Sequence, residues 1–200
     1  MARKIKFPNK RMIIIEAASV LFDQYGYENV TVCQIAKCAG IGKGTVYTEF
    51  KNKQEIMTAV LYQFMSDVNQ HIKELINHSD DTVINILKKV QLQRILLHYD
   101  HARNNFHSTE LFTISLDKIK NHDQMHSESD NITAELLKKA AANKEIAVLD
   151  NYLKTAVSIR KALISLYPPF VFVYNNKEDV IKESNRLLSI LLAGLTSQRF

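Results

Sequence analysis

The residues of this chain best suited to chemistry are hydrogen-bonding side chains gathered in one short segment, residues 43–48. A lysine, a tyrosine and two threonines lie there beside a glycine. Lysine and hydroxyl groups bind phosphate oxygens, hydroxyl groups also reach the edges of bases, and glycine allows close approach of the backbone. The segment therefore indicates recognition of a polyanion, and the residues expected to contact it are Lys43, Gly44, Thr45, Tyr47 and Thr48.

The positive charge of the chain is concentrated around this segment. Residues 1–53 carry nine basic and four acidic side chains, whereas residues 54–200 carry seventeen of each. The formal net charge of +5 thus belongs entirely to the first part of the chain. A basic head on a neutral body is typical of nucleic-acid binding, although basic ends also occur on proteins with other roles.

Two helices are predicted before the segment. Apolar residues with helical spacing indicate a helix over residues 10–25, which ends at Gly26, a residue suited to the left-handed backbone conformation. Thr31 and Gln34 then have the form of a capping box, which predicts the start of a second helix.

A tight turn and a third helix follow. Ala39-Gly40 ends the second helix, and a third begins near Gly42 or Lys43 and buries Val46 and Phe50. Two short helices joined by a turn containing glycine form a helix-turn-helix, whose second helix enters the major groove of DNA.

Each of these features also has a purely structural explanation. Ile35, Ala36, Val46 and Phe50 would be core residues in any three-helix unit. Thr31 has a role as a helix cap, and lysine residues also occur on any solvated face. The short helix pair, the exposed tyrosine and threonines and the concentrated charge favour DNA binding only in combination.

The pattern extends over a longer run of fixed spacings. Its residues are Ile14-Ile15-Glu16-Ala17-Ala18-Ser19-Val20-Leu21-Phe22, Tyr25-Gly26-Tyr27, Thr31, Ile35-Ala36, Ala39-Gly40-Ile41, Lys43-Gly44-Thr45-Val46-Tyr47, Phe50 and Lys53. Without a gap, this run resembles the DNA-binding domain of the TetR/AcrR family. The resemblance implies a homodimeric all-α repressor with a three-helix head and a variable body that contains a ligand pocket.

The resemblance also assigns expected roles to individual residues. Thr31, Tyr47 and Lys53 match positions that usually bind phosphates. The positions that usually face the groove are matched by Lys43, Gly44, Thr45 and Thr48.

Two residues depart from the family pattern. Gly42 stands where serine is usual, which removes a capping hydroxyl, although glycine is tolerated at this position. Glu49 stands where histidine or an aromatic residue is usual. Its carboxylate would either repel phosphate or accept a hydrogen bond from cytosine N4, and the operator sequence depends on which.

The remainder of the chain is predicted to be helical. We expect a long amphipathic helix from Lys53 to about Ile76 that joins head to body, and further helices at about 83–99, 109–119, 130–142, 147–167 and 177–197. The strand-like run 170–174 has no partner strand and is interpreted as an apolar connection. The expected fold is all-α with about nine helices, divided into a DNA-binding domain, 1–53, and a ligand-binding and dimerisation domain, 54–200.

The last helix carries a broad apolar stripe that has two explanations. In a monomer it would be a core helix, whereas the family resemblance implies a four-helix bundle with a second subunit. Two heads would then reach half-sites one helical turn, ~34–36 Å, apart on a palindrome. The expected dimerisation residues are Leu163, Leu187, Leu188, Leu191 and Leu195.

An apolar or amphipathic effector is expected in the body, but aromatic and methionine residues at helical spacing are more often plain core. The residues that we expect to line its pocket are Tyr62, Met65, Tyr99, Phe106, Phe112, Met125 and Tyr152. The pairs His98/His101 and His122/His126 have metal-ligand spacing but polar surroundings, so no metal and no cofactor is predicted.

The sequence also favours a location and argues against other classes of function. There is no apolar run long enough for a membrane span and no signal-peptide pattern, and two unpaired cysteines suit a cytoplasmic protein. An enzyme is not expected, since Gly42-Lys43-Gly44-Thr45 lacks the preceding glycine and strand of a phosphate-binding loop. A DNA-binding protein without a small ligand is the remaining alternative to a ligand-controlled repressor.

Overall fold

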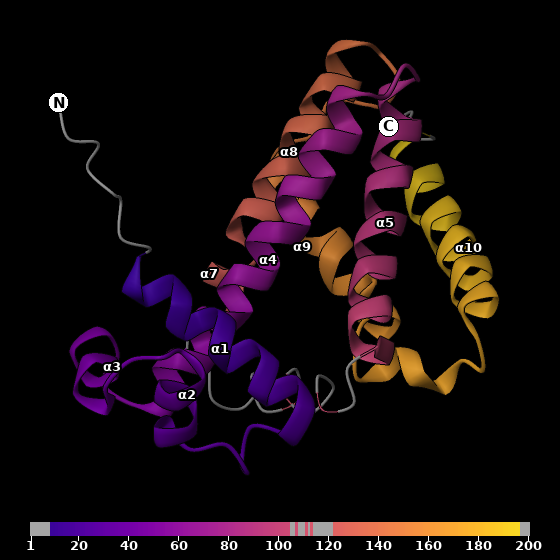
Figure 1. Ribbon diagram of the computed structural model, residues 1–200. Helices are drawn as coiled ribbons and strands as arrows, with labels where there is room; N and C mark the ends of the chain where they lie inside the picture. Colours follow the sequence, from indigo (N-terminus) through magenta and orange to yellow (C-terminus); the bar gives the residue numbers. More distant parts are fainter. Residues whose placement is uncertain (1–8, 105–106, 108–110, 112, 114–121, 197–200) are drawn as a thin grey trace, which may run out of the picture. The chain divides into compact units, whose positions relative to one another are not determined.

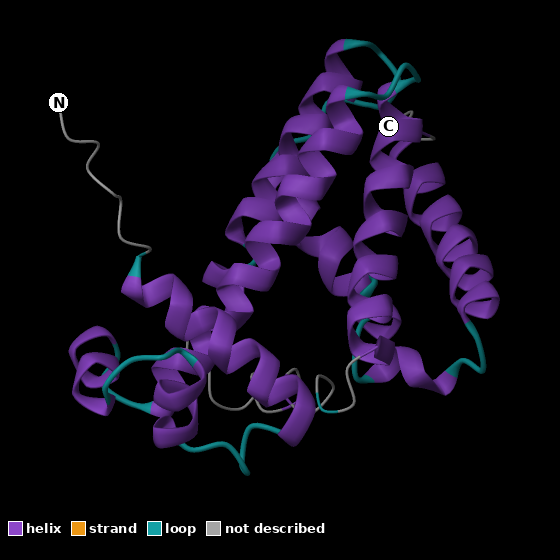
Figure 2. Ribbon diagram, viewed as in Figure 1, coloured by secondary structure: helices purple, strands orange, loops and turns teal. Residues whose placement is uncertain are grey.

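The computed structural model describes residues 9–104, 107, 111, 113 and 122–196. Over these residues the chain forms nine α-helices and two short 3₁₀ helices, and Figure 2 shows that they include no strand. The predicted all-α fold of about nine helices is therefore confirmed. The chain divides into two compact units, which we call unit 1 (residues 1–64 and 102–120) and unit 2 (residues 65–101 and 121–200).

Unit 1 contains the predicted three-helix head. Its helices are α1 (Lys10–Tyr25), α2 (Val32–Cys38), α3 (Lys43–Glu49) and the first part of α4 (Lys53–Asn77), and α1, α2 and α3 lie together in Figure 1. The predicted helix over 10–25 and the helix starts at Thr31 and Gly42 are confirmed. The fully buried side chains that hold these helices together include Ile14, Phe22, Ile35, Val46, Phe50 and Met57.

Unit 2 is built from longer helices. They are the second part of α4, α5 (Val83–Asn104) as far as residue 101, α7 (His122–Met125), α8 (Ser127–Ala142), α9 (Tyr152–Ala162) and α10 (Lys177–Thr196). The 3₁₀ helices η1 (Ile164–Leu166) and η2 (Phe170–Val173) connect α9 to α10. The core contains Ile72, Leu87, Ile95, Leu137, Leu163 and Leu166.

Some helix boundaries in unit 2 differ from the prediction. The helix expected from residue 147 begins at Tyr152, because the Asn151 side chain accepts a hydrogen bond from the Lys154 backbone N–H and caps it there. It also ends early, at Ala162, and η1 follows it. The prediction of one helix over 147–167 was therefore wrong. The run 170–174 is not a strand, as expected, but forms η2.

Four further expectations concern the helix over 109–119, the domain boundary, membrane spans and the cysteines. The predicted helix over 109–119 lies largely outside the described residues, as do Phe106 and Phe112. The domain boundary at residue 53 stays a prediction, and α4 continues unbroken from Lys53 to Asn77. Among the helices described, none is long and apolar enough to cross a membrane. Cys33 and Cys38 are both exposed on α2 and form no disulfide.

Candidate nucleic-acid interface

The turn between α2 and α3 has a geometry that requires glycine. Gly40 has a φ of 66° and donates its N–H to the Lys37 carbonyl, while the Ile41 N–H reaches back to the Ala36 carbonyl. These two bonds form a Schellman motif, which ends a helix and reverses the chain. The turn thus fixes the direction in which α3 leaves α2.

The start of α2 is fixed by the predicted capping box. The Thr31 hydroxyl accepts from the Gln34 N–H at 3.3 Å, and the Gln34 side-chain oxygen accepts from the Thr31 N–H at 2.8 Å. The Thr31 hydroxyl also donates to that same oxygen at 2.7 Å. Its proton is therefore used within the cap, and a phosphate contact by Thr31 stays a prediction.

The residues of α3 that were predicted to contact DNA lie on its exposed side. Val46 is fully buried and anchors the helix, whereas Lys43, Gly44, Tyr47 and Thr48 are exposed and Thr45 is half-buried. Tyr47 leaves 48% of its surface exposed, and the Lys43 ammonium lies 5.7 Å from the centre of its ring. The Thr48 hydroxyl donates to the Thr45 carbonyl at 2.7 Å and keeps its lone pairs for donors outside the helix.

Gly44 is not required by the fold of α3. A β-carbon added there would meet no atom within 4 Å, and the position lies inside a helix, where glycine is unfavourable. Glycine at this position leaves the exposed surface of α3 without a side chain.

Arg11 holds the end of α3 against α1. Its guanidinium lies 4.1 Å from the centre of the Phe50 ring and donates to the Glu49 carbonyl at 2.9 Å. The Glu49 side chain is half-buried. Sequence reasoning counted Arg11 only as a charge; no spacing signal links it to residues almost forty positions away.

The side chain of Lys53 forms hydrogen bonds within the protein. Its ammonium donates to the carbonyls of Tyr27, Glu28 and Val30 at 2.7, 3.3 and 2.9 Å, and it lies 4.3 Å from the centre of the Tyr27 ring. An ammonium has three N–H donors, and these carbonyls match all three. Lys53 therefore ties the start of α4 to the loop before α2, and its predicted phosphate contact stays untested.

The predicted effector and dimerisation residues are dispersed over the helices. Met65, Tyr99 and Met125 are buried, Tyr152 is half-buried, and Tyr62 is 38% exposed. The predicted dimerisation residues divide into two groups: Leu163 and Leu188 are fully buried in the core of the chain, and Leu187, Leu191 and Leu195 are half-buried. Ile190, which was not among the predicted residues, lies on the same helix α10 as Leu187, Leu191 and Leu195 and is 60% exposed.

The histidine pairs form no cluster with a third ligand among the described residues. His98 is buried, its ring packs edge-on against Tyr167 at 4.9 Å, and its Nδ1 lies 2.8 Å from the Arg94 carbonyl. Burial lowers the pKa of His98 to about 4.

These features together define a helix-turn-helix DNA-binding protein. The family model for the bacterial regulatory proteins of the tetR family matches residues 14–60. An HTH-type transcriptional regulator of Staphylococcus aureus is 33% identical over 129 residues, which cover 58% of this chain and 70% of that protein. The chain belongs to the TetR family of transcriptional regulators, which is not a family of enzymes.

Other relatives match different lengths of the chain. YhgD, an HTH-type transcriptional regulator of Bacillus subtilis, is 37% identical over 71 residues, and this match covers only 37% of its length. The fatty acid metabolism regulator protein of B. subtilis is 27% identical over 196 residues, or 93% of this chain and 95% of that protein.

Two solved structures show the same fold. FadR from B. subtilis, solved in complex with stearoyl-CoA, superposes with a TM-score of 0.66 and 25% identity over 92% of this chain and 98% of its own. SmeT, the repressor of the Stenotrophomonas maltophilia multidrug efflux pump SmeDEF, superposes with a TM-score of 0.68 and 18% identity over 96% of this chain and 93% of its own.

Proposed function

We propose that this transcriptional regulator is a homodimeric repressor that a small apolar or amphipathic ligand releases from a palindromic operator. The observation that carries the DNA-binding part is the face of α3, where hydrogen-bonding side chains are exposed above the buried Val46. Lys43, Gly44, Thr45 and Thr48 are proposed to face the groove and Tyr47 to contact its phosphate edge.

Thr31 and Lys53 are proposed to act at the flanks of this surface. Both use their polar hydrogens within the protein, so their main contribution is to hold α2 and the loop before it in position. The charge of Lys53 still adds to the attraction for phosphate, which depends on distance more than on a direct hydrogen bond.

The effector part of the proposal is supported by relatives. One is named as a regulator of fatty acid metabolism, one structure contains stearoyl-CoA, and another is a repressor of a multidrug efflux pump. Each of these names refers to a different protein; for this chain they support an apolar or amphipathic effector, which we place in the predicted ligand-binding domain, residues 54–200. Ligand binding that favours one arrangement of the dimer over another would change operator affinity.

The dimer part of the proposal is supported by α10. Ile190 is 60% exposed, and the half-buried Leu187 lies three residues before it and four before the half-buried Leu191, the spacings of neighbours on a helix surface. We propose that these residues and Leu195 form the contact. Leu163 and Leu188 support it from inside the core, and sedimentation of the purified protein would give its oligomeric state.

Operator binding provides the test. Binding of the purified protein to the DNA upstream of its own gene is measured at several salt concentrations for the wild type, Lys43→Ala and Tyr47→Ala. Tyr25→Ala is the control for Tyr47→Ala, since the two tyrosines are equally exposed (47% and 48%), and Lys138→Ala on α8 controls for charge.

We expect specific binding that both α3 variants weaken and both controls retain. Loss of a phosphate contact would lower the slope of log affinity against log salt by about 1. Weak binding that is indifferent to sequence and to these substitutions would contradict the repressor function at that promoter. Specific binding that no ligand alters would leave DNA recognition intact and contradict effector control.

A further inference from the structure

Arg94 is a buried arginine whose hydrogen-bonding groups are only partly used. It lies on α5 and is 5% exposed. One terminal nitrogen, Nη1, donates to the Thr133 hydroxyl at 2.8 Å, but Nε and Nη2 are buried and have no hydrogen-bond partner. Burial lowers the pKa of Arg94, although Tyr167 and Asp130 partly oppose this shift. A buried charged group with unpaired donors lowers the stability of the folded chain, unless a bound ion supplies the missing partner.

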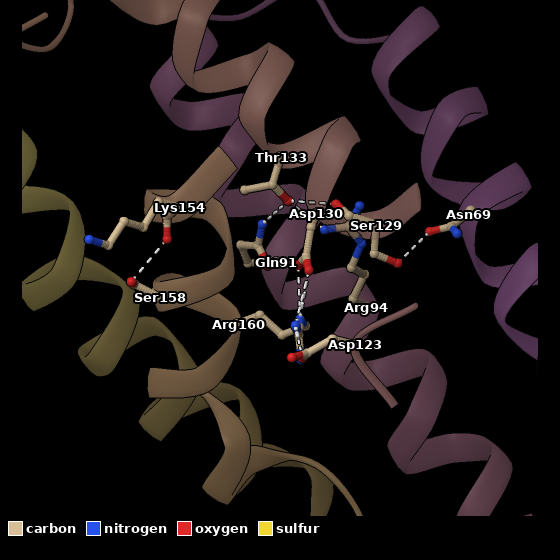
Figure 3. Close-up of polar contacts among 10 residues, drawn as sticks. All are labelled: Asn69, Gln91, Arg94, Asp123, Ser129, Asp130, Thr133, Lys154, Ser158 and Arg160. Carbon is tan, nitrogen blue, oxygen red and sulfur yellow. Dashed lines mark hydrogen bonds and ion pairs between the residues drawn. The ribbon is translucent and has the colours of Figure 1, made fainter. Parts of the chain in front are cut away.

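The Thr133 hydroxyl, which holds one nitrogen of Arg94, has no capacity left for a second one. The Thr133 hydroxyl donates to the Ser129 carbonyl at 3.0 Å and accepts from both Arg94 and the Gln91 amide. The Ser129 hydroxyl in turn donates to Asn69 at 2.8 Å. Figure 3 shows these contacts between α4, α5 and α8. The network orients Arg94 through one nitrogen and leaves the other two unpaired.

A second arginine of unit 2 shows what the unpaired edge can bind. Arg160 on α9 grips the Asp130 carboxylate side-on, with Nε 2.9 and 3.2 Å from its two oxygens and Nη2 3.0 Å from one of them (Figure 3). Its Nη2 also reaches Asp123 at 3.0 Å. Nε and Nη2 form the fork that matches a carboxylate, and they are the same two nitrogens that lack partners in Arg94.

The charges around Arg94 indicate which kind of ion its unpaired nitrogens would bind. Asp130, the buried carboxylate of this region, is already paired with Arg160. No ion pair among the described residues includes Arg94, and the Asp130 carboxylate favours its positive charge only from beyond ion-pair distance. A monoanion neutralises this positive charge, whereas a phosphate dianion would leave a buried negative charge.

We propose that the Nε–Nη2 edge of Arg94 binds the carboxylate of a small organic acid. The buried residues of α5 near Arg94 are mainly apolar (Leu87, Val90 and Ile95), with Gln91 and His98 as buried polar residues, and the rest of the acid is therefore proposed to be an apolar chain or ring. The identification of this acid with the effector rests on the proposed function. The binding site itself does not.

Direct binding to the full chain without DNA tests the site. The probes are straight-chain carboxylates from hexanoate to decanoate, the alcohols of the same lengths, and decyl phosphate, measured by calorimetry and thermal shift. We expect wild type to prefer a carboxylate over its alcohol by about tenfold or more, as for hydrogen bonds to a charged group. Arg94→Gln should abolish this preference, and Lys154→Gln, which removes an exposed charge of the same unit, should retain it.

Several results would overturn the proposal. They are equal binding of alcohol and carboxylate by wild type, tighter binding of decyl phosphate, carboxylate preference retained by Arg94→Gln, and no binding of any acid at millimolar concentration. Arg94→Met provides a measurement without ligand. The proposal expects its melting temperature to be at least that of wild type, and a marked decrease would show that Arg94 is needed for the fold instead.

The same probes separate this proposal from the proposed function. Acids that bind through Arg94 but do not change operator affinity would confirm the site and contradict its role in release. Release of DNA by neutral ligands, unchanged in Arg94→Gln, would confirm effector control and contradict the site.

Discussion

The two units differ in how their polar groups find partners. In unit 1, α2 begins on a cap made by Thr31 and Gln34, which are three residues apart. In unit 2, α5 begins on the Glu145 carboxylate, which accepts from the N–H groups of Val83 and Ile84 at 3.1 and 2.8 Å from about sixty residues away. One cap depends on a local motif and the other on the packing of the whole unit.

The longer-range bonds differ in the same way. In unit 1, Arg11 and Lys53 donate to backbone carbonyls, which any residue supplies. In unit 2, the bonds of Arg160 and Arg94 join one side chain to another, so each requires two particular residues. Unit 1 can therefore keep its geometry when its surface residues are substituted. A substitution in the interior of unit 2, by contrast, disrupts its side-chain hydrogen bonds.

Asp130→Ala should give the largest effect, because it removes a partner from a buried pair. The Arg160 side chain is 14% exposed and would lose its side-on carboxylate. Breaking such a pair costs about 3 kcal/mol of the free energy of unfolding, measured by urea denaturation. The double variant Asp130→Leu/Arg160→Met should recover most of this loss. A decrease below about 1 kcal/mol would show that the Asp130–Arg160 pair contributes no more than an exposed ion pair.

Acid should destabilise unit 2 through His98. Its pKa is about 4 in the folded chain, below the ordinary 6.5, chiefly because it is buried; His101 and Arg94 also disfavour its charged form. Since the depressed pKa favours neutral histidine in the fold, stability is present above pH 6.5 and is lost as the pH falls toward 4. Between pH 7 and 5 the loss is about 2 kcal/mol. His98→Phe should lack this component, and equal pH dependence of the two proteins would contradict the assignment.

Lys53→Met should destabilise unit 1 by less. The three carbonyls of the loop before α2 would lose charge-assisted bonds but remain near solvent, so the expected loss is about 1.5 kcal/mol. Lys51→Met, at an exposed lysine two residues earlier, is the control and should leave the urea midpoint unchanged. If both variants behave alike, the carbonyl contacts contribute nothing beyond surface charge.

The smallest effects should distinguish the two glycines around α3. Gly40→Ala places a side chain at a φ of 66° and should cost about 1 kcal/mol. Gly44→Ala has room for its methyl group and should stabilise α3 by about 0.5 kcal/mol, while it weakens operator binding. Thermal unfolding and DNA titration of both variants measure the two effects. Unchanged DNA affinity in Gly44→Ala would show that Gly44 does not lie against the DNA groove.

The contrast between local and long-range polar contacts also explains which features the sequence could predict. The capping box, Gly40 and the buried Val46 follow from neighbours a few residues away, so the head was predicted almost to the residue. The protein partners of Arg11 and Lys53 were missed, because they lie more than twenty positions away.

In unit 2, helical periodicity located the helices but not their polar interior. The Asn151 cap was missed, and a helix was consequently started too early. No local pattern marks Arg94, Thr133 and Asp130 as neighbours, since they come together only when α5, α8 and α9 pack. Apolar spacing also failed to separate core leucines such as Leu188 from surface residues such as Ile190.

The exposed thiols of α2 also have a practical consequence. Cys33 and Cys38 are the only cysteines in the chain, and the chain contains no tryptophan. A maleimide fluorophore would thus label the native protein only on α2, the first helix of the helix-turn-helix, and Cys33→Ser or Cys38→Ser would reduce the label to one site. A tryptophan introduced at Phe172 would provide a separate optical signal from unit 2. Operator binding and effector binding would then be followed at two wavelengths in one sample.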